Sequence, residues 1–252
     1  MVIRFLGTGT STGVPELGCT CSVCTSADFR DNRLRSSVQI HVDNVNIIID
    51  CTPDFRQQMF FVPFEKIDGL LLTHEHYDHI GGLDDLRPFC RFGPVNIYAE
   101  SNVTHALEYR MPYIFSDHKY MGIPELFFHD IQYPQSFFIQ SVEIQPIRVM
   151  HYKLPILGYR IGGFAYLTDL KYLPEDEMVK LKDLDILVIT ALRKKDHISH
   201  QNLAEAIQLA ERVGAKRTYF THMSHHIGLH AEVEREIPKN MYFAYDGLEL
   251  KI

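Results

Sequence analysis

The segment Thr73–His79 constrains this chain more than any other feature. It reads Thr-His-Glu-His-Tyr-Asp-His and comes directly after the apolar run Gly69–Leu72. A short apolar run that ends in polar residues is typical of a buried strand. Three histidines and one aspartate would then leave the end of that strand in one loop, where they can ligate metal ions. These side chains are His74, His76, Asp78 and His79. A polar loop with incidental histidines is the alternative, and it does not explain so dense a group.

Further candidate ligands stand at the ends of other predicted strands. His151, Asp169 and His222 each come at the point where an apolar or β-branched run stops. A single histidine in such a place is more often structural than a ligand. Together with the loop after Leu72, the three positions indicate a dinuclear metal site.

A cluster of cysteines near the start of the chain indicates a second kind of metal site. Cys19, Cys21 and Cys24 supply three thiolates, one ligand short of a tetrahedral zinc site. Three buried free cysteines are the alternative. The chain has five cysteines, and an odd, clustered set favours metal binding in a reducing cytoplasm over a disulfide framework.

Length and charge limit the classes of protein to consider. The 252 residues suit one large domain or at most two, and we expect residues 1–252 to form a single domain. The net charge of −7 disfavours a long nucleic acid as partner. No apolar run approaches the roughly 18 residues of a membrane span, and the first residues do not resemble a signal peptide, so we expect a cytoplasmic protein without a membrane partner.

The order of predicted elements points to a layered α/β (α+β) fold. Strands run in two blocks, each followed by helices, which predicts two mixed β-sheets packed face to face with helices outside, a four-layer αββα sandwich. We expect helices over Pro53–Phe61 and Leu83–Arg91, from an N-cap at Ser101 to about Arg110, and from an N-cap at Asn202 up to Gly214. Leu126–His129, Ser136–Gln140 and Val142–Met150 are expected to be antiparallel strands.

Two loops leave alternatives open. Gly7–Gly13 consists of small residues, which suit either a phosphate cradle or a tight turn where backbones pass closely. Met111–Pro124 has no clear period, and it is typical of a lid over the site or of a surface that forms a homodimer.

The ligand pattern resembles that of the metallo-β-lactamase fold superfamily, and the resemblance covers nearly the whole chain. It implies that His74, His76 and His151 hold one metal ion and that Asp78, His79 and His222 hold the other. It also implies that Asp169 bridges the two ions. Two such cations, Mn²⁺ or Zn²⁺, activate a hydroxide for attack on a phosphodiester.

His200 matches a further feature of the phosphodiesterase branch of this superfamily. In that branch a histidine six residues before a helical alanine assists catalysis, and His200 and Ala206 have this spacing. The implied role is proton donation to the leaving oxygen or stabilisation of charge on the phosphoryl group. A structural histidine at the start of a helix is the alternative, and we expect a structural role for His197.

A narrower resemblance is to the PhnP-like phosphoribosyl cyclic phosphodiesterases. The segments that carry it are Leu6–Pro15, Gly18–Cys24 and Thr221–His225. It implies a structural zinc held by Cys19, Cys21, Cys24 and His225, with His226 and His230 as rival ligands. The implied activity is hydrolysis of a small cyclic sugar-phosphate diester. A ribonuclease Z-like tRNA 3′-end endonuclease and a non-catalytic metal-binding module are the alternatives.

Cations near the predicted ligands are candidates for contact with an anionic substrate. Lys153 and Arg148 flank His151, and Arg193–Lys195 precedes His200. Solvated side chains are the alternative for each.

Overall fold

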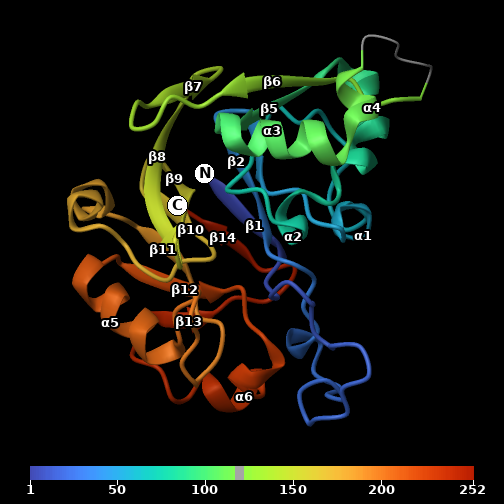
Figure 1. Cartoon of the computed structure of the whole chain (residues 1–252). Helices are drawn as coiled ribbons and strands as arrows, with labels where there is room; N and C mark the ends of the chain where they lie inside the picture. Colours follow the sequence, from blue (N-terminus) through green and yellow to red (C-terminus); the bar gives the residue numbers. More distant parts are fainter. Residues whose placement is uncertain (117–121) are drawn as a thin grey trace.

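Two β-sheets face each other in the computed structural model, which describes residues 1–116 and 122–252 (Figure 1). One sheet has the strand order β14-β1-β2-β3-β4-β5-β6 and the other the order β13-β12-β11-β10-β9-β8-β7. Both are mixed, and the helices lie on their outer sides. The predicted αββα sandwich is therefore confirmed.

The first sheet pairs the two ends of the described chain. Its edge strand β14 lies antiparallel to β1, and β3 to β6 run parallel to one another. The strands are β1 (Val2–Gly7), β2 (Ser37–Val42), β3 (Val45–Ile49), β4 (Gly69–Leu71), β5 (Val95–Ala99), β6 (Leu126–Asp130) and β14 (Glu249–Lys251).

The second sheet begins with a meander and continues with parallel strands. The first strands alternate in direction, whereas β10 to β13 are parallel. The strands are β7 (Phe137–Ile139), β8 (Val142–His151), β9 (Leu154–Ile161), β10 (Phe164–Leu167), β11 (Ile186–Thr190), β12 (Arg217–Thr221) and β13 (Met241–Phe243).

The helices are mostly short. The α-helices are α1 (Phe55–Met59), α2 (Tyr77–Ile80), α3 (Ser101–Arg110), α4 (Pro112–Phe115), α5 (Leu203–Val213) and α6 (His230–Val233). Single 3₁₀ segments cover Phe29–Asp31, Leu83–Phe92, Glu175–Leu181 and His225–Ile227. The segment between Gly13 and Phe29 extends from the body as an arm, seen at the lower right of Figure 1.

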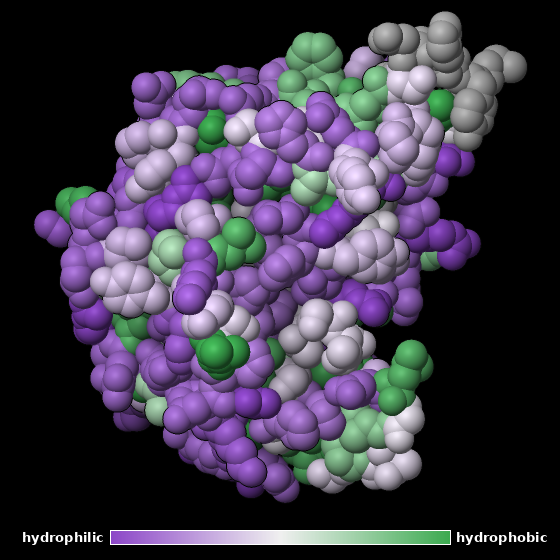
Figure 2. Space-filling view, viewed as in Figure 1, coloured by the Kyte–Doolittle hydropathy of each residue, from purple (hydrophilic) through white to green (hydrophobic). Residues whose placement is uncertain are grey.

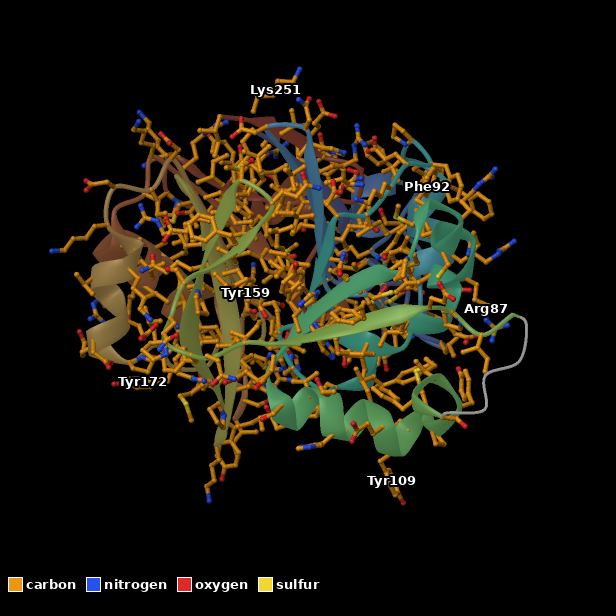
Figure 3. The ribbon with its side chains drawn as sticks, turned by 90° about the horizontal axis from the view of Figure 1, so that it is seen from above. Arg87, Phe92, Tyr109, Tyr159, Tyr172 and Lys251 are labelled. Carbon is orange, nitrogen blue, oxygen red and sulfur yellow. The ribbon has the colours of Figure 1, made fainter. Side chains whose placement is uncertain are left out.

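Three apolar layers hold the sandwich together. The middle layer lies between the sheets and contains Phe5, Tyr159 and Tyr166, all fully buried. Figure 3 shows Tyr159 inside the molecule, whereas Tyr109 on α3 points outward. One outer layer packs the second sheet against α5, and the other packs the first sheet against α1 and α3. Burial on both faces explains why β3 and β11 are mostly β-branched and aliphatic along their whole length.

Some predicted elements differ from the structure. β6 pairs in parallel with β5, because α3 and α4 form the crossover between them, so the prediction of an antiparallel strand was wrong. Leu83–Phe92 is a 3₁₀ helix that contains Pro88. The N-cap of α3 is Glu100 rather than Ser101, and α1 is shorter than the predicted Pro53–Phe61.

The loop after β1 brings backbones together. A Cβ atom on Gly7 would lie 2.0 Å from the carbonyl oxygen of Arg35, and one on Gly9 would lie 2.8 Å from that of Arg33. Gly9 also forms a bridge with Met223, the residue after His222. The close-approach reading of this loop is the one that the structure supports.

The Met111–Pro124 segment is described only in part. Its first residues form α4, and residues 117–121 lie outside the described residues. Its role as a lid or as a homodimer surface stays a prediction. Among the helices of the described residues, none has the length and apolar character needed to cross a membrane.

The cap of α5 offers a test of the fold next to His200. The Asn202 side chain accepts a hydrogen bond from the Glu205 backbone amide, and the Glu205 carboxylate accepts one from the Asn202 backbone amide, while Gly214 ends the helix in a left-handed conformation. Replacing Asn202 with Ala should lower the free energy of unfolding by about 1 kcal/mol, because an N-terminal amide loses its partner. Urea denaturation measures the change. Gln208→Ala, on the exposed face of α5, is the control, and an equal loss there would contradict the cap's role.

Candidate metal centre

The ends of four strands and the short helix α2, which carries Asp78 and His79, bring all seven predicted ligands to one place. His74 lies just beyond β4, His151 ends β8, Asp169 lies just beyond β10, and His222 directly follows β12. The ligand atoms form two groups, and within each group they lie within 4.8 Å of one another. The first group is His74, His76, His151 and Asp169, and the second is Asp78, His79, Asp169 and His222.

The Asp169 carboxylate belongs to both groups. Its Oδ1 lies 3.2 Å from Nε2 of His79 and 3.1 Å from Nε2 of His222. Its Oδ2 lies 3.8 Å from Nε2 of His74 and 3.9 Å from Nε2 of His151. Each oxygen therefore faces a different group, which is the geometry that a bridging carboxylate requires.

Hydrogen bonds to Nδ1 orient two histidines of the loop. His79 Nδ1 lies 2.7 Å from the buried Asp50 carboxylate. Thr73 donates its hydroxyl to Asp50, so it accepts from His74 Nδ1 at 3.0 Å. With the proton held on Nδ1, each ring turns an Nε2 lone pair inward.

Backbone carbonyls orient His151 in the same way. Its Nδ1 lies 3.0 Å from the carbonyl oxygens of both Asp169 and Ser199. The ring is thereby tied to the strand end that carries Asp169 and to the segment that carries His200. Its Nε2 faces the first ligand group.

Buried nitrogens without hydrogen bonds indicate that the residues fit metal ions. Across residues 1–116 and 122–252, Nε2 of His74, His79 and His222 has no hydrogen-bond partner, although each atom is buried. Burial lowers the pKa of His74 well below its usual value, which favours the neutral, metal-binding form. Burial would raise the pKa of Asp169, but His222 and His79 hold it well below the usual range. Imidazole nitrogens around an ionised carboxylate are a donor set that suits divalent cations.

Three backbone conformations near the site are strained. Asp50, Asp169 and His222 have φ angles of 65°, 53° and 58°, in the left-handed region that favours glycine. Such conformations cost about 1–3 kcal/mol each and persist only where surrounding contacts impose them. The strain fits a site whose ligand directions are set by the fold.

His200 lies against the ligands. Its ring stacks on His222 with 4.9 Å between centroids and lies 4.6 Å from the ring of His151. Burial lowers its pKa to about 3, and Asp169 offsets this only in part. The ring is therefore neutral near pH 7. His197 lies next to His200, with 5.1 Å between the two ring centroids.

The arm brings its three cysteines to a histidine far along the chain. The ligand atoms of Cys19, Cys21, Cys24 and His225 lie within 4.8 Å of one another. His225 Nδ1 is 3.4 Å from Cys19 Sγ and 3.3 Å from Cys21 Sγ, and its hydrogen bond lowers the pKa of Cys21 to about 6. The other ring nitrogen lies 3.2 Å from Glu16, as in histidines that ligate zinc.

The two rival histidines have other positions. The His226 ring packs against His225 at an interplanar angle of 35° but does not belong to the cysteine group. His230 is buried, and its ring nitrogens face Arg33 at 3.2 Å and Glu234 at 2.7 Å. Of the three candidates, His225 is the one that the structure places beside the thiols.

Most of the cationic side chains predicted to contact substrate already bind other groups of the protein. The Arg148 guanidinium makes a bidentate contact with Glu100 at 2.7 and 2.5 Å, which speaks against its predicted contact with substrate. Arg193 donates to backbone oxygens of its own loop, and Lys194 pairs with Glu236. Lys153 is exposed and lies 5.3 Å from the ring centre of Tyr152. Figure 2 shows a mostly hydrophilic surface over this face of the molecule, with apolar residues gathered on the arm.

Asp50 and Ser199 are site residues that the sequence did not single out. Asp50 follows the β-branched run of β3, so a polar residue at the end of a buried strand was its signal. Ser199 contributes through its backbone carbonyl, for which the side chain gives no signal.

Comparison with known proteins identifies relatives of the whole chain. Residues 45–223 match the family model described as a β-lactamase superfamily domain. An octanoyltransferase of Porphyromonas gingivalis is 44% identical over 246 residues, which cover 97% of this chain and 50% of that protein. Coenzyme PQQ synthesis protein B of Methylobacterium radiotolerans is 30% identical over 125 residues, 43% of this chain and 42% of that protein. The chain thus spans about half the length of these curated relatives.

Solved structures share the fold across nearly all residues. A crystal structure of a new diphosphatase from the PhnP family is 40% identical, with a TM-score of 0.92, and covers 99% of this chain and 96% of that one. Zinc-bound PqqB from Methylobacterium extorquens has a TM-score of 0.82 at 19% identity, with full coverage of both chains. The short form of human tRNase Z has a TM-score of 0.73 at 20% identity, covering 100% of this chain and 99% of that one.

The similarities to PqqB and to human tRNase Z show a shared fold alone, because the sequence identities are only 19% and 20%. The family model and the diphosphatase carry more weight, since one matches most of the chain and the other aligns with almost all of it. The chain therefore belongs to the β-lactamase superfamily and, within it, to the PhnP family.

Proposed function

We propose that this protein is a metal-dependent phosphodiesterase that hydrolyses a small cyclic sugar-phosphate diester. The observation that carries the proposal is the pair of ligand groups that share Asp169. The 40% identity to a PhnP-family diphosphatase supports phosphoester chemistry at this centre. Two divalent cations bound there, Mn²⁺ or Zn²⁺, would lower the pKa of a water molecule and neutralise charge on the phosphoryl oxygens.

The ligand residues have separate tasks in this proposal. His74, His76 and His151 would hold one cation, Asp78, His79 and His222 the other, and Asp169 both. Asp50 keeps the proton of His79 on Nδ1, away from the metal-binding nitrogen.

His200 would act on the phosphoryl group as a hydrogen-bond donor. It is buried beside His151 and His222, and its pKa of about 3 leaves it neutral at physiological pH. A neutral imidazole is a weak proton source, but its N–H can stabilise charge that develops on oxygen. Of the two roles that the resemblance implies, this geometry supports charge stabilisation.

The octanoyltransferase name describes a protein of which half lies outside the match. We do not carry that activity over to this chain, because the ligand groups that it brings together favour metal-dependent hydrolysis.

Metal removal tests the reaction class. Protein treated with a chelator should lose hydrolysis of bis(p-nitrophenyl) phosphate and regain it with Mn²⁺ or Zn²⁺. Asp169→Ala should lower kcat/KM by about 10²-fold or more, because both cations lose a ligand. Full activity in the chelated protein, or in Asp169→Ala, would overturn the proposal. Release of p-nitrophenol is the measurement.

Replacing His200 separates its role from metal binding. His200→Ala should lower kcat by about 10²–10³-fold while the metal content stays unchanged, because a donor is lost and no ligand. His197→Ala is the matched comparison and should have a much smaller effect. Equal losses in the two variants, or loss of metal from His200→Ala, would contradict the assignment. Steady-state kinetics and elemental analysis provide the two readouts.

Two neighbouring histidines test the structural zinc. His225→Ala should bind about one zinc equivalent fewer than the unmodified protein, since its imidazole completes the cysteine group. His226→Ala should keep the full content, because its ring packs against His225 and does not belong to the cysteine group. Zinc is counted after dialysis by mass spectrometry of the elements. The reverse pattern would make His226 the ligand.

A further inference from the structure

Arg33 is a buried cation at the base of the arm. Its side chain is 3% exposed, and its backbone pairs with Val14 on the other side of the arm. Nη1 donates to the Thr8 hydroxyl at 2.9 Å and to the Ala244 carbonyl at 2.7 Å, and Nη2 lies 3.2 Å from His230 Nδ1. One guanidinium thus contacts the loop after β1, the end of β13 and the start of α6.

The contacts of Arg33 are unusual for a buried charge. Among the ion pairs of the described residues, none involves its guanidinium. Burial lowers its pKa to about 10, so it stays charged at neutral pH. A buried cation without a directly paired carboxylate is costly, and it persists where its directed hydrogen bonds are needed.

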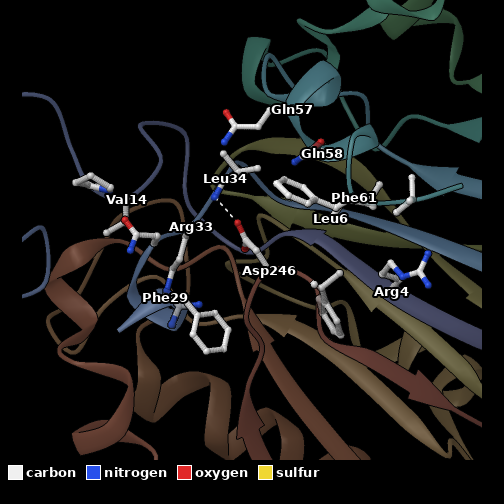
Figure 4. A pocket seen from close by; sticks show the side chains of 15 residues that line it. Arg4, Leu6, Val14, Phe29, Arg33, Leu34, Gln57, Gln58, Phe61 and Asp246 are labelled. Carbon is white, nitrogen blue, oxygen red and sulfur yellow. Dashed lines mark hydrogen bonds between the residues drawn. The ribbon is translucent and has the colours of Figure 1, made fainter. Parts of the chain in front are cut away.

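Thr8 carries the contact toward the metal centre. Its hydroxyl receives the Arg33 hydrogen bond and donates to Asp246 at 2.7 Å. Asp246 also accepts from the Leu34 amide, the bond dashed in Figure 4, beside the labelled Arg33. The Thr8 side chain is therefore fixed between the cation and the carboxylate.

The backbone of the same residue reaches the ligand loop. The Thr8 carbonyl accepts from the Met223 amide at 3.0 Å, and the Thr10 amide donates to the Met223 carbonyl at 3.0 Å. Met223 directly follows His222, whose φ of 58° must be imposed by its surroundings. Arg33 also contacts His230 at the far end of this loop, so it holds the loop from both sides.

We propose that Arg33 is a positioning residue for His222, one ligand of the second group. It acts through Thr8 and Met223 and keeps the His222 imidazole directed at the cation. The effect is selective, because the contacts reach Met223, next to His222, and none of the histidines of the first group. The metal part of this inference rests on the proposed function.

Hydrogen exchange tests the contact in metal-free protein. The Met223 amide should exchange at least about tenfold faster in Thr8→Val, where the hydroxyl link to Arg33 and Asp246 is gone. Thr12→Val is the matched control, since that hydroxyl contacts only the neighbouring Gly13 carbonyl. Unchanged exchange at Met223 in Thr8→Val, or an equal rise in Thr12→Val, would overturn the proposal.

Metal titration tests the consequence. Mn²⁺ added to metal-free Thr8→Val should bind the weaker of two sites about 10–100-fold less tightly than in the unmodified protein, with the other site unchanged. Equal weakening at both sites would contradict a selective role. If the unmodified protein binds fewer than two ions, the proposed function fails, while hydrogen exchange still decides the role of Arg33.

Chemical rescue gives an independent test. Arg33 lines a cavity of about 570 Å³, bordered by Phe29, Phe61 and Asp246, through which a small cation can enter (Figure 4). Arg33→Ala should lose Met223 protection and the weaker Mn²⁺ site, and millimolar guanidinium should restore both. Arg33→Lys should not respond to guanidinium, because its side chain fills the space. If Arg33→Ala folds and guanidinium restores neither the Met223 protection nor the Mn²⁺ site, the proposal is wrong. If Arg33→Ala does not fold, the Thr8→Val variant decides the outcome.

Discussion

The Asp169 carboxylate is the group on which both parts of the metal centre depend. One of its oxygens faces His79 and His222, and the other faces His74 and His151. These histidines follow strands of both sheets, so they can reach one carboxylate only if the two sheets pack in a fixed relative position. The apolar layer between the sheets fixes that position, and the left-handed backbone at Asp169 sets the direction of its side chain. The packing of this apolar layer therefore stabilises a polar cluster that would not assemble by itself.

A second set of contacts ties the ends of the chain to this centre. The arm meets the loop that follows β12 at His225, while Thr8 and Arg33 meet it at Met223 and His230. Residues near the start of the chain therefore hold the loop of the last ligand. This explains why a glycine-rich loop without a phosphate-binding motif matters, since a Cβ on Gly7 or Gly9 would collide with the backbone of residues 33–35, against which the loop lies where Gly9 bridges to Met223.

Much of the site was predictable because metal ligands are chemically distinctive and strand ends are visible as the ends of apolar runs. The layers followed from the order of strands and helices, and Asn202 and Gly214 marked α5 correctly. The direction of β6 was not predictable, because a short apolar run does not encode its partner strand. The roles of Asp50, Ser199 and Arg33 were also invisible, since they depend on contacts between residues far apart in the sequence.

The arm has a consequence for how the chain is made. Its three thiols leave the ribosome early, whereas His225 is added about 200 residues later, and β14 completes the first sheet only at the last residues described. During that interval the cysteines have no imidazole partner and are open to oxidation or to capture of the wrong ion. Synthesis in a reducing environment, with the proposed zinc ion supplied once His225 has been added, would protect this arm.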